Sequence, residues 1–109
     1  MTTLEDARAT VEEYLAALST RTNIDLAVDE AATRSEPWCW IFFYTSRAHL
    51  ETGSFRHALA GNGPLVVERD TGRLHELGTA RPVDEQLEEL RRTVEREPRR
   101  PSAVPAVGL

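Results

Sequence analysis

The sequence predicts an α+β fold with a four-stranded, largely antiparallel sheet and two flanking helices, in the order α-β-β-β-β-α. Two segments, one over residues 3–20 and one from Pro82 to Glu97, repeat apolar side chains at helical spacing. Four segments between them read as strands, over residues 23–30, 38–46, 65–70 and 73–78. A chain of 109 residues is long enough for one domain and too short for two. We therefore expect helices packed on an antiparallel sheet.

The first helix is predicted by a single apolar stripe. Thr2 and Glu5, three residues apart, fit a capping box at its start. The stripe that should face the core consists of Leu4, Ala7, Val11, Tyr14, Leu15 and Leu18.

The first predicted strand, residues 23–30, alternates between apolar and polar side chains. This pattern predicts a half-exposed strand with an acidic outer face. Asp25, Ala27 and Asp29 should point outward, and Ile24, Leu26 and Val28 inward. After this strand, the segment from Arg34 to Pro37 reads as a polar connector.

The second predicted strand, residues 38–46, is apolar on both faces, which is typical of a central strand covered on both sides. Trp40 and Phe42 are expected in the core. Trp38 lies beside Pro37 at the beginning of the strand, so it is the best candidate for an exposed aromatic residue. Alternation places Trp38, Trp40, Phe42 and Tyr44 on one side, and Cys39, Ile41 and Phe43 on the other.

Residues 47–63 read as irregular, with one helical turn around Phe55–Leu59. The segment ends in a corner formed by Gly61, Asn62, Gly63 and Pro64, where two glycines and an asparagine tolerate left-handed backbone and Pro64 fixes the entry into the next strand. Strands 65–70 and 73–78 should form a hairpin in which Gly72 supplies a positive φ. Residues 3–96 are thus predicted to form the domain, and the proline- and arginine-rich residues 97–109 a disordered tail.

The charge of the chain is distributed unevenly. Residues 1–90 carry 16 Asp and Glu against 8 Arg, whereas residues 91–109 carry 5 Arg against 2 Glu. An acidic body argues against nucleic-acid binding and is compatible with a basic protein partner, although it also serves solubility alone. One cysteine, no apolar run of about 20 residues and an acidic N-terminus predict a cytoplasmic protein with no membrane span.

No catalytic, metal or cofactor constellation is visible in the sequence. His49, His57 and His75 lack metal-ligand spacing, and Cys39 lies within a strand and not at a helix start. The paired carboxylates read as solvated faces. We therefore expect no enzyme activity, no cofactor and no small-molecule ligand.

Several short motifs occur in a characteristic order. These are Trp40-x-Phe42-x-Tyr44-x-Ser46, Leu50-x-Thr52-Gly53, Gly61-Asn62-x-Pro64, Asp70-Thr71-Gly72 and Gly78-Thr79-x-x-Pro82. In order and spacing the chain resembles the bacterial immunity protein 35 family, which includes the YrhB-like proteins, over about residues 3–95.

The resemblance implies a non-enzymatic inhibitor that binds a cognate polymorphic toxin stoichiometrically. Because YrhB-like members are also described as small heat-stable chaperones, a chaperone that holds unfolded clients is the alternative. For an interface with a toxin, the sequence predicts Asp25 and Asp29 as acidic contacts and Trp38 as an aromatic anchor.

Overall fold

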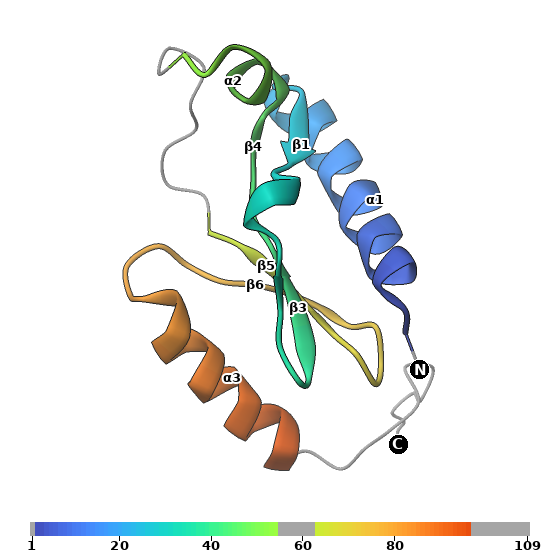
Figure 1. Ribbon diagram of the computed structural model, residues 1–109, viewed down its shortest axis with the longest axis vertical. Coiled ribbons are helices and arrows are strands. Elements are labelled where there is room, and N and C mark those ends of the chain that lie inside the picture. Colours follow the sequence, from blue (N-terminus) through green and yellow to red (C-terminus); the bar gives the residue numbers. More distant parts are fainter. Residues whose placement is uncertain (1, 55–62, 97–109) are drawn as a thin grey trace.

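The fold is α+β, as predicted, in a computed structural model that describes residues 2–54 and 63–96. Within these ranges the chain forms three α-helices, one short 3-10 helix and six strands (Figure 1). The bounds are α1 Leu4–Thr22, β1 Leu26–Val28, η1 Glu30–Ala32, β2 Arg34–Ser35, β3 Cys39–Phe42, β4 Tyr44–Ser46, α2 Arg47–Thr52, β5 Leu65–Glu68, β6 Leu74–Glu76 and α3 Val83–Arg96.

The strands form two antiparallel sheets instead of one. The four-stranded sheet has the order β2-β3-β5-β6, and β1 pairs with β4 in a separate two-stranded sheet. The prediction was therefore wrong about which strands form the main sheet. The supposed connector Arg34–Ser35 is edge strand β2, paired with Ile41 and Trp40 of β3.

The predicted strand 38–46 is divided at Phe43. Its first half, β3, is buried at every position and pairs with β2 and β5, which confirms the prediction of a central strand. The pairing with β5 ends at Phe42 and Leu65. Beyond that point β4 pairs with β1 instead.

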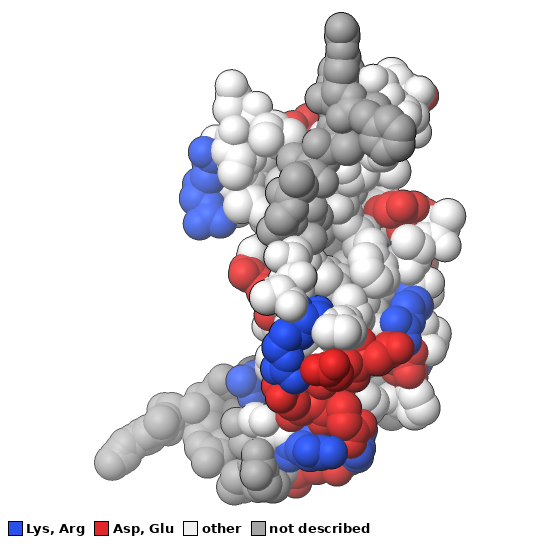
Figure 2. Space-filling model, turned by 90° about the vertical axis from the view of Figure 1, so that its left-hand side faces the viewer, with Lys and Arg blue, Asp and Glu red and all other residues white. Residues whose placement is uncertain are grey.

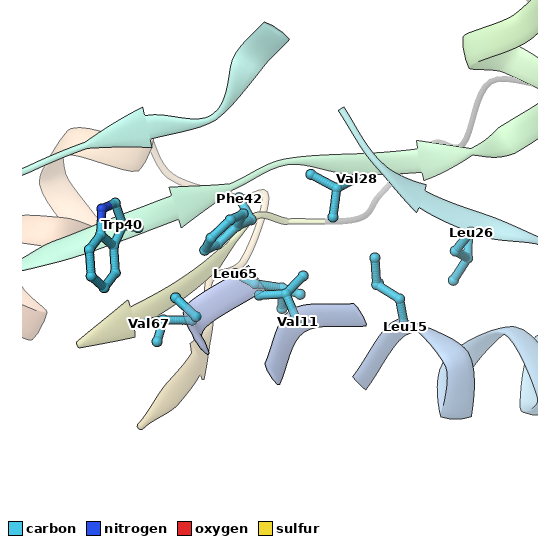
Figure 3. Close-up of a cluster of buried hydrophobic side chains, with 9 residues drawn as sticks. Val11, Leu15, Leu26, Val28, Trp40, Phe42, Leu65 and Val67 are labelled. Atoms are coloured by element: carbon cyan, nitrogen blue, oxygen red, sulfur yellow. The ribbon is translucent and has the colours of Figure 1, made fainter. Parts of the chain in front are cut away.

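Two hydrophobic clusters lie on opposite faces of the four-stranded sheet. One lies beneath α1 and is drawn in Figure 3, and the other lies beneath α3, whose place is seen in Figure 1. Alternation along β3 divides its side chains between them, so that Trp40 and Phe42 join α1 while Cys39 and Ile41 join α3. The α1 cluster consists of Ala7, Val11, Leu15, Leu26, Val28, Trp40, Phe42, Leu65 and Val67. The α3 cluster consists of Cys39, Ile41, Val66 and Leu87.

Two predicted side-chain positions are wrong at the ends of strands. Trp38 packs against the α3 cluster, although strict alternation placed it beside Trp40. Ile24 was expected inside but is 38% exposed, because β1 begins only at Leu26. Both residues lie outside the strands, since β3 begins at Cys39 and β1 at Leu26.

The capping box of α1 lies one residue later than predicted. The Thr3 hydroxyl accepts a hydrogen bond from the Asp6 N–H, and the Asp6 carboxylate accepts one from the Thr3 N–H. The backbone N–H of Thr2 instead donates to the Arg69 carbonyl at 2.8 Å. This hydrogen bond also ties the N-terminus to the end of β5.

Two glycines fix the path of the chain around β5 and β6. Gly72 adopts φ +76°, which confirms the predicted role in the hairpin. Gly63 is required for a different reason, since a Cβ atom there would lie 1.8 Å from the Leu77 carbonyl oxygen. This close approach sits beside the hydrogen bond from the Leu77 N–H to the Pro64 carbonyl, which extends the β5–β6 ladder.

Helix α2 follows β4 directly, in a segment that was predicted to be irregular. The Ser46 hydroxyl caps its start by accepting from the His49 N–H, and Gly53 ends it with φ +70°. The predicted turn at Phe55–Leu59, the corner residues Gly61 and Asn62, and the predicted tail 97–109 lie outside the described residues. Helix α3 begins directly after Pro82, as expected.

Candidate partner-binding surface

The two predicted acidic contacts flank β1. Asp25 is exposed, and its carboxylate forms an ion pair with Arg47 Nε at 3.0 Å, while its carbonyl accepts from the Arg47 N–H. Asp29 is half-buried and precedes η1 without capping it through its side chain. Asp25 is therefore held in place by the start of α2, and Arg47 partly balances its charge.

Trp38 lies at different spacings along the chain from the two acidic residues. Asp29 lies beside Phe43, five positions from Trp38, because its N–H donates to the Phe43 carbonyl at 2.8 Å. Arg47, the partner of Asp25, lies nine positions from Trp38. At about 3.3 Å per residue of extended chain, these spacings set upper limits of roughly 16 and 30 Å. Trp38 itself is half-buried against the α3 cluster.

The predicted structural residues hold the core together. Phe42 and Trp40 are 0% and 6% exposed, and the Arg69 guanidinium covers the Trp40 ring at 4.3 Å from its centre. Arg69 reaches across to the edge of the sheet, where it donates to the Ser35 hydroxyl and to the Glu36 carbonyl. Pro64 is buried at the beginning of β5, as its role as a corner requires.

A polar cluster that the sequence analysis missed lies between α1 and β6. The Tyr14 hydroxyl donates a short hydrogen bond to Glu76 Oε2. Burial, together with the hydrogen bond and charge of Glu76, raises the pKa of Tyr14 to about 12. Burial and the same carboxylate also raise the pKa of Tyr44. Tyr14 and Glu76 thus meet across two elements, and no short-range pattern could reveal this contact.

A second missed group is the buried carboxylate of Glu68, which is 3% exposed. It accepts hydrogen bonds from the Thr71 hydroxyl at 2.9 Å and contacts His75 Nε2 at 2.5 Å. Glu68 is the register partner of Cys39, and His75 that of Val66, so the pair lies on the sheet face beneath α3. The hydrogen bonds satisfy a carboxylate that would be costly to bury alone, and its burial removes it from contact with a substrate.

Reactive groups are scarce in the described ranges. Burial raises the pKa of the Cys39 thiol to about 12, so almost no thiolate forms at neutral pH. Residues 2–54 and 63–96 contain no cluster of three or more His, Cys, Asp or Glu side chains that could hold a metal ion.

Charged side chains gather over α3, but most of them neutralise one another. Figure 2 shows acidic and arginine side chains interleaved over the lower part of the visible face, where α3 lies. The ion pairs include Arg81–Glu89, Arg91–Glu95 and Arg92–Glu88. Such exposed pairs contribute little stability, and their balance leaves the surface of α3 without one dominant sign.

Three large apolar side chains are exposed in the described part of the chain. They are Leu4, Ile24 and Leu50, each about 40% exposed, and they come from the start of α1, the α1–β1 turn and α2. As for membranes, no helix in the ranges 2–54 and 63–96 has the length and apolar character needed to span a bilayer.

Comparison with known proteins gives a consistent result. Residues 5–91 match the family model of immunity protein 35. The protein from Escherichia coli strain K12 described as uncharacterized protein YrhB is 44% identical over 50 residues, which are 46% of this chain and 53% of that protein. The chain thus aligns with about half the length of this curated relative. No solved structure matches the chain.

Proposed function

Because the chain belongs to the immunity protein 35 family, we propose that it neutralises a co-encoded polymorphic toxin by direct stoichiometric binding. The match over residues 5–91 is the observation that carries this proposal, since it includes almost all of the described fold. The toxin would be held in a one-to-one complex that covers its active site or its docking surface. The role would be non-enzymatic.

The acidic body supports a basic partner. Residues 1–90 carry twice as many acidic as basic side chains. Charges at the rim of an interface chiefly accelerate encounter and make association sensitive to salt. Asp25 and Asp29 would act in this way, whereas Trp38, which packs partly into the α3 cluster, would act on dissociation if the toxin covers its remaining exposed edge.

The proposal is tested by expressing the toxin encoded beside this gene, with and without this chain, in cells that lack both. Protection of growth by the chain is the expected result. Killing that the chain does not relieve would reject the immunity function.

Purified variants then separate the contributions of the three predicted contacts. Replacing Asp25 and Asp29 together by alanine should slow association and weaken its salt dependence. Trp38→Ala should raise the dissociation rate by roughly ten-fold, which corresponds to about 1.4 kcal/mol. Glu12→Ala, an exposed acidic residue on α1, serves as the charge control. If all three predicted contacts can be replaced without changing either rate, the interface lies elsewhere on the protein.

A further inference from the structure

Two residues of β6, Leu74 and Glu76, have backbone groups on the outer edge of the sheet that no strand pairs with. Strands β5 and β6 are hydrogen-bonded between Glu68 and Arg73 at one end and between Pro64 and Leu77 at the other. The pair Val66 and His75 lies midway between these two hydrogen bonds. Because such bonds alternate along an antiparallel pair, the N–H and C=O groups of Leu74 and Glu76 point away from β5. Within residues 2–54 and 63–96, these backbone groups have no hydrogen-bond partner.

The edges at β1 and β2 are less suited to receive a strand. On β1, the outward N–H of Leu26 already donates to the Ser19 hydroxyl of α1 at 3.0 Å. On β2, the pairing with β3 leaves only the backbone of Ser35 directed outward, and the strand is two residues long. Short edges of this kind are a usual protection against unwanted pairing. Strand β6 therefore has more capacity to pair than β1 or β2.

Side chains beside this edge define what it would accept. Glu76 is exposed and lies on the α1 face of the sheet, because it is the register partner of Leu65. Tyr14 binds its Oε2 and fixes the carboxylate, while its Oε1 has no hydrogen-bond partner among the residues described. Tyr44 packs against the same α1 cluster as Tyr14, and the charge of Glu76 contributes to its raised pKa. A fixed carboxylate beside tyrosines suits an arginine or lysine side chain.

From these observations we infer that β6 is the docking edge for an extended basic segment of the toxin, which adds a strand antiparallel or parallel to β6 and places a cationic side chain on Glu76. Backbone hydrogen bonds at Leu74 and Glu76 supply affinity, and the cation on Glu76 supplies specificity. A second copy of this chain fits less well. Pairing two β6 edges would bring together two chains that each carry a formal charge of −5.

This inference rests on the proposed function, and one experiment distinguishes the two. The probe is the catalytically inactive toxin domain encoded beside this gene, added to the full chain, with amide hydrogen exchange followed residue by residue. We expect at least ten-fold slower exchange at Leu74 and Glu76 in the complex, with no change at Ser35 on the opposite edge. Glu76→Gln should weaken binding about ten-fold, and Glu12→Gln, which changes the net charge equally, less than two-fold.

Each other result has a defined meaning. Binding with unchanged exchange at Leu74 and Glu76 would overturn the docking edge and leave the immunity function standing. Absence of any binding would overturn both. Sedimentation of the chain alone as a dimer, with Leu74 and Glu76 protected in that dimer, would replace the basic partner by a second copy. If Glu76→Gln binds as tightly as the wild type while both amides are protected, the inferred cation contact is wrong.

Discussion

Replacing Phe42 by alanine should lower the free energy of unfolding by about 3–5 kcal/mol. Phe42 is completely buried in the α1 cluster, and Figure 3 shows it between Trp40 and Val28, above Leu65 and Val11. Removing the ring loses roughly 2–3 kcal/mol of transfer free energy. A residual cavity of about 60 Å³ adds roughly 1.5 kcal/mol at about 24 cal/mol per Å³. Since β3 pairs on both sides, the backbone cannot collapse freely into the space.

Urea unfolding followed by tryptophan fluorescence measures this change. With a slope of roughly 1.5–2 kcal/mol per molar urea, the midpoint should fall by about 2 M. Phe42→Leu, which leaves a smaller cavity, should cost about 1–2 kcal/mol and provides a value if the alanine variant is already unfolded. Leu4→Ala is the matched control, because Leu4 is 41% exposed, and should cost less than about 1 kcal/mol. If Phe42→Ala unfolds within about 0.3 M urea of the wild type, β3 is not the central strand of the core.

Two further predictions concern the segments around β6. Gly63→Ala should destabilise the fold by about 1–3 kcal/mol and selectively accelerate hydrogen exchange at Leu77, because the added Cβ would displace the Leu77 carbonyl; unchanged exchange at Leu77 would show that this approach is not required. In alkaline titration monitored by tyrosine absorbance, Tyr14 should ionise at about 12, above the ordinary value of about 10. Its pKa is raised on folding, so its contribution to stability is complete below about pH 10 and is lost as pH rises through about 12. Glu76→Gln should return the pKa of Tyr14 toward its ordinary value, and an equal titration in both proteins would contradict the Tyr14–Glu76 contact.

Long periodic segments of the fold could be predicted because their signals are local. The stripe through Val11 and Leu15, the β5–β6 hairpin with Gly72, and α3 after Pro82 depend on spacing or turn chemistry within one segment. The unbroken apolar run at Cys39–Phe42 likewise identified the central strand.

The elements that were missed are short or are decided by distant partners. Strand β2 has only two polar residues, and it is a strand because Ile41 and Trp40 pair with it. The capping signals for α2 were present at Ser46 and Gly53, but six residues are too few for a helical stripe. The requirement for glycine at residue 63 comes from Leu77, fourteen positions away.

Candidate interface residues were harder to predict than the core. Alternation correctly directed Asp25 to the surface, yet nothing in the sequence indicated its ion pair with Arg47. Trp38 was expected to be exposed because of Pro37, whereas the packing of α3 covers part of it. The cluster of Tyr14, Tyr44 and Glu76 joins three elements across the fold, so only the folded chain brings it together.

Titration of the purified toxin encoded beside this gene with the full chain tests the central claim most directly. Calorimetry and residual toxin activity are measured in the same series. The immunity function predicts a one-to-one endpoint, tight binding, and complete loss of toxin activity at equimolar chain. Full toxin activity in a ten-fold excess of chain, with no heat of binding, would contradict it.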